Sequence, residues 1–425
     1  MTGGTRKRGA TWSYYFDLGT VGGKRQKKEK GGFKTKKEAE AALAKAISEY
    51  NSAGAVFEPS GITVADFLDQ WYDLYCKPNL KYNTQINYLY TIKNHLKPQF
   101  GQYRLKALTP AVLQEYANGL KLAGYSRGHI TSMLAMFRTA LDYAVEPLQY
   151  LSSNPMRFVK FPKVERGPRQ RVVLTLEQWE QIMERFPAAS RYHVPLMLGF
   201  YCGLRISETV ALTWDDIDFQ TRTIMVSKQA VKRKGGADVR KAVESPEDRP
   251  EPAAWYFGST KTASSQRVIH FGETLYKALK AERAAQLSNE LKRGESYIVH
   301  LLEKTTDEKG NDLYKLVPAP KGMKSDLPRV PLVCVAASGA YTSSDSCKSV
   351  AKIVHHELGF PFDYHSLRHT HATLLIESGA DVKDVQERLG HGNIKTTLQN
   401  YVHNTDTMKN RSVEIFEQAV TRKSS

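Results

Sequence analysis

The sequence predicts a protein of several domains that is mainly α-helical and carries small β-sheets. A period-two pattern near the N-terminus indicates a strand, whereas helical spacing of apolar residues dominates residues 62–150. Beyond residue 173, helical segments alternate with short strand-like runs, which is typical of an α+β domain. The chain has 425 residues, 41% hydrophobic and 25% charged, so it can bury two or three separate cores.

The charge of the chain indicates a polyanionic partner. The formal net charge is +17, and residues 1–50 hold 12 lysines and arginines against 5 aspartates and glutamates. No apolar run approaches the roughly 20 residues that span a bilayer, and no signal-peptide pattern opens the chain. We therefore expect a cytoplasmic protein with no membrane partner. Four scattered cysteines indicate reduced thiols and neither a zinc site nor disulfides: Cys76, Cys202, Cys334 and Cys347.

Residues 1–55 are expected to form a small sheet backed by one helix. Trp12, Tyr14 and Phe16 would share the aromatic face of a first strand. Thr35 and Glu38 have the spacing of a capping box ahead of a helix that continues to about residue 52.

Between these elements, three glycines predict a turn and a basic run predicts a second strand: Gly19, Gly22 and Gly23, then Lys24–Lys30. A run of charged residues usually does no more than form a solvated surface. On a basic protein, a basic sheet favours DNA binding instead, through Lys24, Arg25, Lys27 and Lys28.

Residues 62–150 are predicted to form an all-α domain. Its expected helices begin at Thr63 and then cover about 83–99, 109–123 and 126–146, with starts at Thr84, Thr109 and Ser126. Lys81 and Lys93 are candidate phosphate contacts, although each alone is more often a solvated lysine. Residues 151–172 contain three prolines, which predicts an extended linker.

The third domain, residues 173–425, contains most of the reactive side chains. Thr175 and Gln178 predict a capping box, and residues 198–212 read as one helix on which Arg205 and Glu208 share a face. Taken alone, this pair would be an ordinary ion pair on a helix. Strand-like runs follow at 223–226 and 267–271, with Lys261 expected at the tip of a hairpin-like segment between them.

A cluster of imidazoles, a guanidinium and a phenol lies near the C-terminus. His365 and Arg368 are three residues apart, so they project from one face of a helix, and a Gly-His-Gly segment then brings in His391. Tyr401 follows at residue 401 as a possible nucleophile. These groups suit phosphate chemistry, because they combine donors for phosphate oxygens with a side chain that can form a covalent intermediate.

Taken together, five separated motifs resemble the tyrosine recombinase (phage integrase) family in order and spacing: Gly203–Glu208, Thr260–Arg267, His365–His369, Leu389–His391 and Tyr401. The resemblance covers essentially the whole chain and is strongest to integrases of prophages and conjugative transposons with an N-terminal arm-binding domain. It implies an arm-type DNA-binding domain (1–55), a helical, SAM-like core-binding domain (62–150) and a catalytic domain with a C-terminal tail helix.

The resemblance also implies a role for each motif residue. Tyr401 would attack a DNA phosphodiester to give a 3′-phosphotyrosyl intermediate, and Lys261 would protonate the leaving 5′-oxygen. The phosphate oxygens would be bound by Arg205 and Arg368, with further hydrogen bonds from His365 and His391, while Glu208 would support the site. This chemistry needs no metal, ATP or other cofactor.

The implied activity is integration and excision of a bacterial mobile element. The expected partners are double-stranded DNA attachment sites of core and arm type and three further copies of the chain in a tetramer. An excisionase and a host DNA-bending protein are candidate additional partners. Two spans look expanded, 228–255 and 287–346, and we expect surface loops or additional DNA contacts there. The tail around 407–421 would pack on its own domain or on a neighbour's.

Three other functions are alternatives to this interpretation. A metal-dependent relaxase also combines histidines with a tyrosine, but His369 and His371 are two apart on a helix and do not face each other. A DNA-binding regulator without catalysis would not need the complete residue set. A type IB topoisomerase shares the chemistry but not the arm-like first module.

Overall fold

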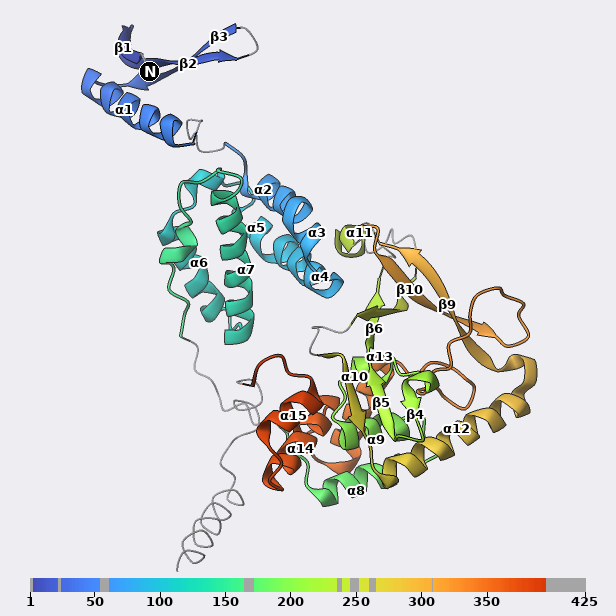
Figure 1. The fold of residues 1–425 in the computed structure, drawn as a ribbon. Coiled ribbons are helices and arrows are strands. Elements are labelled where there is room, and N and C mark those ends of the chain that lie inside the picture. The colour runs from blue at the N-terminus through green and yellow to red at the C-terminus, as the bar shows by residue number, and fades with distance from the viewer. Residues whose placement is uncertain are drawn as a thin grey trace, which may run out of the picture. The chain divides into compact units, whose positions relative to one another are not determined.

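The computed structural model describes residues 3–21, 24–53, 61–163, 172–234, 239–244, 252–259, 265–307 and 309–394. The chain divides into two compact units, Met1–Gly167 and Pro168–Ser425, which are described separately (Figure 1). Lys261, Tyr401 and the expected tail helix lie outside the described residues.

The first unit begins with an antiparallel sheet of three strands covered by one helix (Figure 1). The elements are β1 (Gly3–Arg8), β2 (Thr11–Val21), β3 (Lys24–Phe33) and α1 (Lys36–Ala53). Tyr14 and Phe16 are buried against α1, so the predicted aromatic face is confirmed for these two residues, while Trp12 is half-buried and outside their cluster. The capping box is confirmed as well, because the amide of Glu38 donates to Thr35 Oγ1 at 3.2 Å.

Two features of this sheet differ from prediction. Strand β1 was not expected, because its sequence Gly-Gly-Thr-Arg-Lys-Arg has no apolar alternation. Gly19 was expected in a turn but lies within β2, where it follows a shift in the pairing register with β3. A glycine inside a strand commonly marks such an irregularity.

The rest of this unit is a helical domain, as predicted. Its principal helices are α2 (Val64–Trp71), α4 (Tyr82–Thr91), α6 (Pro110–Leu122) and α7 (Arg127–Val145). Thr63, Thr109 and Ser126 each cap a helix by accepting a backbone N–H, as expected. Thr84 is not a helix start, because α4 begins two residues earlier, after Lys81.

Two of these helices widen into π-helical turns before a Lys-Pro dipeptide. Helix α2 continues through η1 (Tyr72–Cys76) into α3 (Lys77–Asn79), and α4 continues through η2 (Ile92–Leu96) into α5 (Lys97–Phe100). Proline lacks an N–H and its ring crowds the preceding turn, which favours a local change in helix winding. The region predicted as one helix over 83–99 is therefore three consecutive segments.

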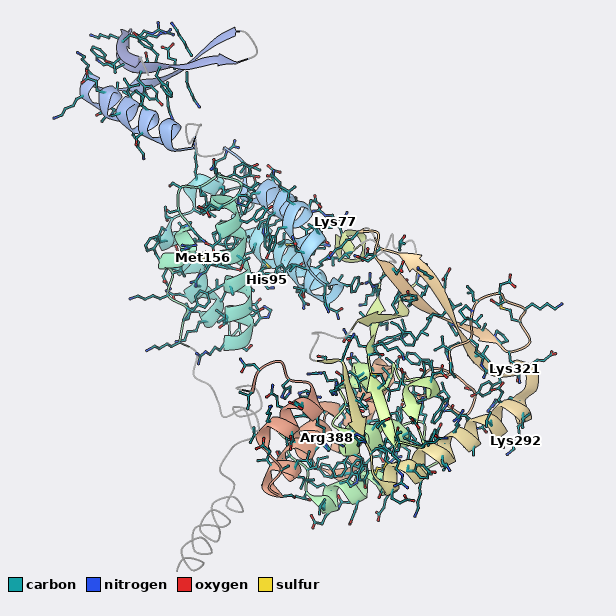
Figure 2. All side chains as sticks on the ribbon, viewed as in Figure 1. Lys77, His95, Met156, Lys292, Lys321 and Arg388 are labelled. Carbon is teal, nitrogen blue, oxygen red and sulfur yellow. The ribbon has the colours of Figure 1, made fainter. Side chains whose placement is uncertain are left out.

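The core of the helical domain is aromatic. Trp71, Phe100 and Phe137 are fully buried, and burial of each contributes about 1.5–3 kcal/mol. Two short 3₁₀ segments complete the domain, η3 (Leu105–Ala107) and η4 (Pro155–Phe158). Met156 of η4 is fully buried (Figure 2).

The second unit combines helices with a small antiparallel sheet. The sheet has the order β4-β5-β8, formed by β4 (Ile217–Asp218), β5 (Thr223–Val226) and β8 (Arg267–His270). Its surrounding elements are α8 (Leu176–Arg185), α9 (His193–Cys202), α10 (Ile206–Thr209), η5 (Trp214–Asp216), α13 (Ser344–Ile353), η8 (Val354–Leu358), α14 (Tyr364–Glu377) and α15 (Val382–Leu389). The capping box of Thr175 and Gln178 and both predicted strands are confirmed.

The expected single helix over residues 198–212 is wrong. Helix α9 ends at Cys202 because Gly203 adopts left-handed backbone with φ 62°, and the chain restarts as the short helix α10. A side chain at Gly203 would also lack room, since its Cβ would lie 2.8 Å from the side chains of both His371 and Leu389. Arg205 therefore lies at the start of α10 and not within a long helix.

Parts of the two expanded spans form strands, where we expected surface loops or additional DNA contacts, whereas residues 321–343 contain only turns, bends and isolated bridges. Together with β7, which extends beyond residue 255, their described parts build a four-stranded antiparallel sheet of order β6-β7-β10-β9, of which Figure 1 labels β6, β10 and β9. The elements are β6 (Lys228–Arg233), α11 (Val239–Glu244), β7 (Ala254–Ser259), α12 (Glu273–Arg293), η7 (Gly294–Ser296), β9 (Ile298–Thr306) and β10 (Asp312–Pro320). Ala230, Phe257 and Leu316 pack this sheet onto Val210.

None of the helices in the described part of the chain is long and apolar enough to cross a membrane.

Candidate active site

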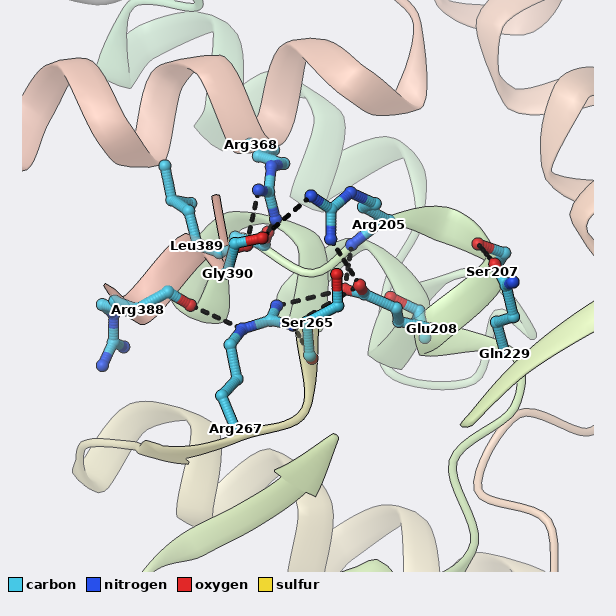
Figure 3. Close-up of polar contacts among 12 residues, drawn as sticks. Arg205, Ser207, Glu208, Gln229, Ser265, Arg267, Arg368, Arg388, Leu389 and Gly390 are labelled. Atoms are coloured by element: carbon cyan, nitrogen blue, oxygen red, sulfur yellow. Dashed lines mark hydrogen bonds and ion pairs between the residues drawn. The ribbon is translucent and has the colours of Figure 1, made fainter. Parts of the chain in front are cut away.

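The C-terminal end of α15 brings three arginines from distant parts of the sequence together. We call residues 388–391, the last two residues of α15 and the two that follow, the α15 turn. Its first three carbonyl oxygens each accept a hydrogen bond from a different guanidinium (Figure 3): Arg388 O from Arg267 Nε at 2.7 Å, Leu389 O from Arg368 Nη2 at 2.6 Å, and Gly390 O from Arg205 Nη2 at 3.4 Å.

The α15 turn suits cations for two reasons. The last carbonyls of a helix have no partner within the helix, and the helix dipole places negative potential there. Gly390 closes the helix in left-handed backbone with φ 65°, and the amide of His391 then donates to Gln386 O at 3.1 Å. The turn is thus held in place independently of the arginines.

Arg205 is held by its own short helix. Its backbone N–H donates to Glu208 Oε2 at 3.0 Å, and its Nη1 donates to Glu208 Oε1 at 2.6 Å. The side chain keeps 27% of its surface exposed, so part of the guanidinium faces solvent. The predicted pairing of Arg205 with Glu208 is therefore present, although it arises at a helix start.

Arg368 is almost completely buried. Helix α14, which carries it, is capped by Asp363, whose carboxylate accepts the amide N–H of Ser366 at 2.8 Å. Arg368 Nη1 donates to Gly203 O at 2.7 Å, and Nη2 donates to the α15 turn. Because Arg368 is 1% exposed, these carbonyl contacts compensate for removing its charge from water.

Glu208 lies between two arginines, and we call this group of three the Glu208 centre. Arg267 Nη2 donates to Glu208 Oε2 at 3.1 Å, while Arg205 occupies Oε1. Glu208 is 3% exposed and Arg267 is 6% exposed. Burial alone would raise the pKa of Glu208, but the charges of Arg267 and Arg205 outweigh burial and lower it. The carboxylate is therefore ionised at neutral pH.

His391 and His365 are the two histidines that were expected to bind the phosphate. His391 is half-buried, and burial followed by the charges of Arg368, Arg205 and Arg267 lowers its pKa to about 3. His365 lies edge-on to His369, with ring centroids 4.6 Å apart. At neutral pH His391 is therefore uncharged and can donate one N–H.

His371 makes structural contacts. Its Nδ1 lies 2.8 Å from Phe200 O, and its Nε2 accepts a hydrogen bond from Arg388 Nε at 3.0 Å. Both ring nitrogens are used, which places the proton on Nδ1. Among the described residues, no group of three or more His, Cys, Asp or Glu side chains is placed to hold a metal ion.

Lys261 lies outside the described residues, and only the strands on either side of it, β7 and β8, bear on the expected hairpin. Strand β8 pairs with β5, Arg267 lying opposite Val226, whereas β7 pairs with β6, Ser259 lying opposite Lys228. Strands β7 and β8 thus pair with successive strands and not with each other. The expected hairpin with Lys261 at its tip is therefore not made by these two strands.

The candidate DNA-contact lysines lie on three elements. Lys24, Arg25, Lys27 and Lys28 belong to β3, Lys81 precedes α4, and Lys93 lies in η2. Lys27, Lys81 and Lys93 are exposed and Lys28 is half-buried, while the side chains of Lys24 and Arg25 lie outside the described part.

Sequence reasoning missed the contacts of two arginines. Arg267 was part of a motif but had no assigned contact, and Arg388 was not singled out. Arg388, labelled in Figure 2, donates to Tyr201 O at 3.1 Å and His270 O at 3.0 Å as well as to His371. An arginine in the last turn of a helix is a common signal for capping, and it does not identify carbonyls from other segments.

Comparison with known proteins places three parts of the chain in known families. Residues 172–408 match the phage integrase family, residues 63–121 match the phage integrase N-terminal SAM-like domain, and residues 5–50 match an arm DNA-binding domain.

The chain is also similar to individual recombinases. It is 25% identical to a XerC-like tyrosine recombinase of Caldanaerobacter subterraneus over 94% of this chain and 95% of that protein. It is 25% identical to the ICEBs1 integrase of Bacillus subtilis over 77% of this chain and 76% of that one.

Two solved structures show the same fold. The Tn1549 transposon integrase in complex with a circular intermediate DNA aligns with a TM-score of 0.60 at 20% identity, covering 84% of this chain and 99% of that one. The lambda integrase tetramer bound to a Holliday junction aligns with a TM-score of 0.51 at 15% identity, covering 89% and 91%.

Proposed function

The chain belongs to the phage integrase family and is a tyrosine recombinase that cuts and rejoins DNA strands at specific sites, and we propose that Tyr401 is its nucleophile. Tyr401 attacks the phosphorus of a DNA phosphodiester, its oxygen forms a bond to phosphorus, and the 5′-oxygen leaves. The phosphodiester energy is kept in a 3′-phosphotyrosyl bond and is returned when another strand's 5′-hydroxyl attacks it. The reaction therefore uses neither ATP nor a metal ion.

The observation that carries the proposal is the convergence of Arg205 and Arg368 on the α15 turn, twelve or fewer residues before Tyr401. Arg205, whose side chain is 27% exposed, presents a planar donor to the non-bridging oxygens of a phosphate, and the buried Arg368 adds positive charge behind it. Because their partners hold them before DNA arrives, little reorganisation is needed as charge develops in the transition state.

The remaining residues complete the proposed site. His391, uncharged at neutral pH, and His365 donate further hydrogen bonds to the phosphate. Lys261 protonates the leaving 5′-oxygen, because an ammonium group can release a proton where guanidinium cannot. Glu208 orients Arg205 and takes no direct part in bond breaking.

The proposed partners are DNA and further copies of the chain. Residues 1–55 would bind arm-type sites, residues 62–150 and the catalytic domain from residue 173 would bind core-type sites, and residues 151–172 would link them. The net charge of +17 and the DNA in the solved complexes of similar integrases support this assignment. A tetramer on two DNA sites is the proposed active assembly, with an excisionase and a host DNA-bending protein as candidate partners in excision.

A nicked suicide DNA substrate tests the proposal, because the fragment beyond the nick diffuses away and leaves the covalent intermediate trapped. Incubation in EDTA should give an SDS-resistant protein–DNA adduct, which Tyr401→Phe should abolish. Tyr276→Phe is the matched control, since it removes the hydroxyl of a half-buried tyrosine of α12 that packs beside Phe219. This control should form the adduct at the normal rate.

Two results would overturn the proposal. An undiminished adduct from Tyr401→Phe would exclude this nucleophile. Loss of cleavage in EDTA would instead indicate a metal-dependent relaxase.

A further inference from the structure

Arg267 makes four side-chain contacts although it has no assigned part in the reaction. Its Nη2 and Nη1 lie 3.1 and 3.4 Å from the two oxygens of Glu208, its Nε donates to Arg388 O at 2.7 Å, and Nη1 also donates to Ser265 O at 3.0 Å. The side chain is 6% exposed. The buried guanidinium of Arg267 thus connects strand β8, which carries it, to Glu208 and to the α15 turn (Figure 3).

We propose that Arg267 is a positioning residue for strand cleavage: it holds Glu208 and the α15 turn in the relative position that Arg205 and His391 need to bind the phosphate. The inference rests on the proposed function of Arg205 and His391. Arg267 itself acts through Glu208 and the Arg388 carbonyl and does not contact DNA.

The charges of the Glu208 centre give the first reason. Glu208 alone would cancel the charge of Arg205, and a neutral pair attracts a phosphate weakly. With Arg267 added, the three side chains carry a net charge of +1, and the shortest contact of each guanidinium is to a different oxygen of Glu208. Arg205 therefore keeps donor capacity and charge for the ligand.

The shape of the guanidinium gives the second reason. Arg267 uses its Nη atoms for Glu208 and its Nε for the Arg388 carbonyl, which is one residue from the carbonyl bound by Arg368. A lysine in this position has the same charge, but its three donors share one nitrogen, so it cannot reproduce the separated Nε and Nη contacts. Arg267→Lys should consequently retain only part of the effect.

The kinetic test compares Arg267→Lys and Arg267→Gln with the unchanged protein on the suicide substrate. With enzyme in excess and DNA saturated, the rate constant of adduct formation should fall about 10-fold in Arg267→Lys and between about 10- and 100-fold in Arg267→Gln, by analogy with the loss of one preorganised donor. The Kd for the same DNA should change less than about threefold. Misfolded protein would lower the amplitude of adduct formation and leave the rate constant unchanged, which separates positioning from loss of fold.

A double-mutant cycle tests whether Arg267 acts through Glu208. Glu208→Gln removes the charge that Arg267 compensates, so Arg267→Gln should slow Glu208→Gln less than it slows the unchanged protein. Arg185→Gln is the control, because Arg185 forms a similar two-contact pair with Glu357 at 2.5 and 3.1 Å on the surface. Its rate constant should be unchanged. Multiplicative effects in the cycle, or a rate constant unaffected by Arg267→Gln, would overturn the proposal.

An NMR titration of His391 gives a readout that does not depend on cleavage. Its ring signal, assigned with His391→Gln, should titrate near pH 3 in the unchanged protein and at higher pH in Arg267→Gln, because one of the cations that lower its pKa is gone. If the unchanged protein forms no adduct, the proposed function fails while this titration still tests Arg267. An unchanged His391 titration in Arg267→Gln would contradict the positioning role.

Discussion

Two glutamates in the same unit each lie between two cations, yet their surroundings differ. Glu208 is 3% exposed and binds Arg205 and Arg267, which also donate to backbone carbonyls of the α15 turn. Glu290 of α12 binds Lys321 at 2.9 Å and Arg329 at 2.6 Å, and we call this group the Glu290 centre. There the glutamate is 14% exposed and both cations are more than two-fifths exposed.

The two centres differ in how strongly burial opposes ionisation of the glutamate, and therefore in why the second cation is needed. At the Glu290 centre, the hydrogen bond from Arg329 is the largest influence and, together with that from Lys321, lowers the pKa of Glu290 to about 2 against the opposing effect of burial. At the Glu208 centre, burial is the largest influence and opposes ionisation, so two guanidiniums are needed to keep the carboxylate charged. The Glu290 centre joins surface segments, whereas the Glu208 centre maintains charge and donors inside a candidate phosphate site.

The largest difference between the centres should appear in stability when each glutamate is neutralised. Glu208→Gln leaves Arg267 buried without its counter-charge, and we expect it to lower the free energy of unfolding by about 3–5 kcal/mol. Glu290→Gln leaves its cations in contact with water, and we expect a loss of about 1–2 kcal/mol. Urea unfolding of both variants measures the two values. Equal losses would show that burial does not distinguish the centres.

The next largest effect should be on cleavage. Arg205→Ala should slow adduct formation on the order of 100-fold, because it removes a donor aimed at the phosphate. Binding of the same DNA should persist and weaken with salt, since it depends on many phosphate contacts. Single-turnover adduct formation at saturating enzyme measures the rate constant. A change below about threefold would remove Arg205 from the proposed site.

A smaller effect is expected at the glycine that joins Arg368 to the Glu208 centre. Gly203→Ala combines left-handed backbone with a Cβ 2.8 Å from His371 and Leu389, and it should lower the free energy of unfolding by about 2–4 kcal/mol. Gly310→Ala is the matched control, because its φ is also positive, at 75°, but no atom lies within 4 Å of the added Cβ. This control should lose only about 1–2 kcal/mol. Equal losses would mean that packing at Gly203 contributes nothing.

Counted per pH unit, the smallest effects should be seen in the pH dependence of stability. His371 and His391 each have a folded pKa of about 3, below the ordinary value of 6.5, so the unfolded chain binds more protons between these values. Stability should therefore fall as pH is lowered from about 6.5 toward 3, by at most about 1.4 kcal/mol per pH unit for each histidine. The pKa of Glu290 is lowered from 4.5 to about 2 in the folded protein, so Glu290 should also reduce stability as the pH falls from about 4.5 toward 2. Urea unfolding across pH should show that His371→Gln flattens the upper range and Glu290→Gln the lower one. No change in either variant would contradict the assignment.

Much of the local structure could be predicted because its signals lie close together in sequence. Thr63, Thr109, Ser126 and Thr175 were recognisable as caps, since a cap depends on the next two or three residues. The helix expected through Gly203 failed because apolar spacing continues across this residue. The space around Gly203, which has no room for a side chain, is limited by His371 and Leu389, and these residues are far along the chain.

The candidate site was predictable in its composition but not in its arrangement. Motif spacing identified Arg205, Glu208, Arg368 and His391 through resemblance to a family. It did not reveal that three arginines bind three consecutive carbonyls at one helix end, or that Arg267 and Arg205 both bind Glu208. The contacts of Arg267 and Arg205 with this helix end join residues 121 and 185 positions apart, so no local pattern contains them. The four-stranded sheet was missed for the same reason, because it combines two separate spans.

The cleavage predictions assume that the phosphate bound by the site is attacked by Tyr401, and mapping of the covalent adduct tests that assumption directly. After trapping on the suicide substrate, nuclease and trypsin treatment should leave a nucleotide on the peptide of residues 396–409, which contains Tyr401 as its only tyrosine. Tandem mass spectrometry should find a 3′-phosphate ester on Tyr401. Attachment to another residue, or through a 5′-phosphate, would contradict the account.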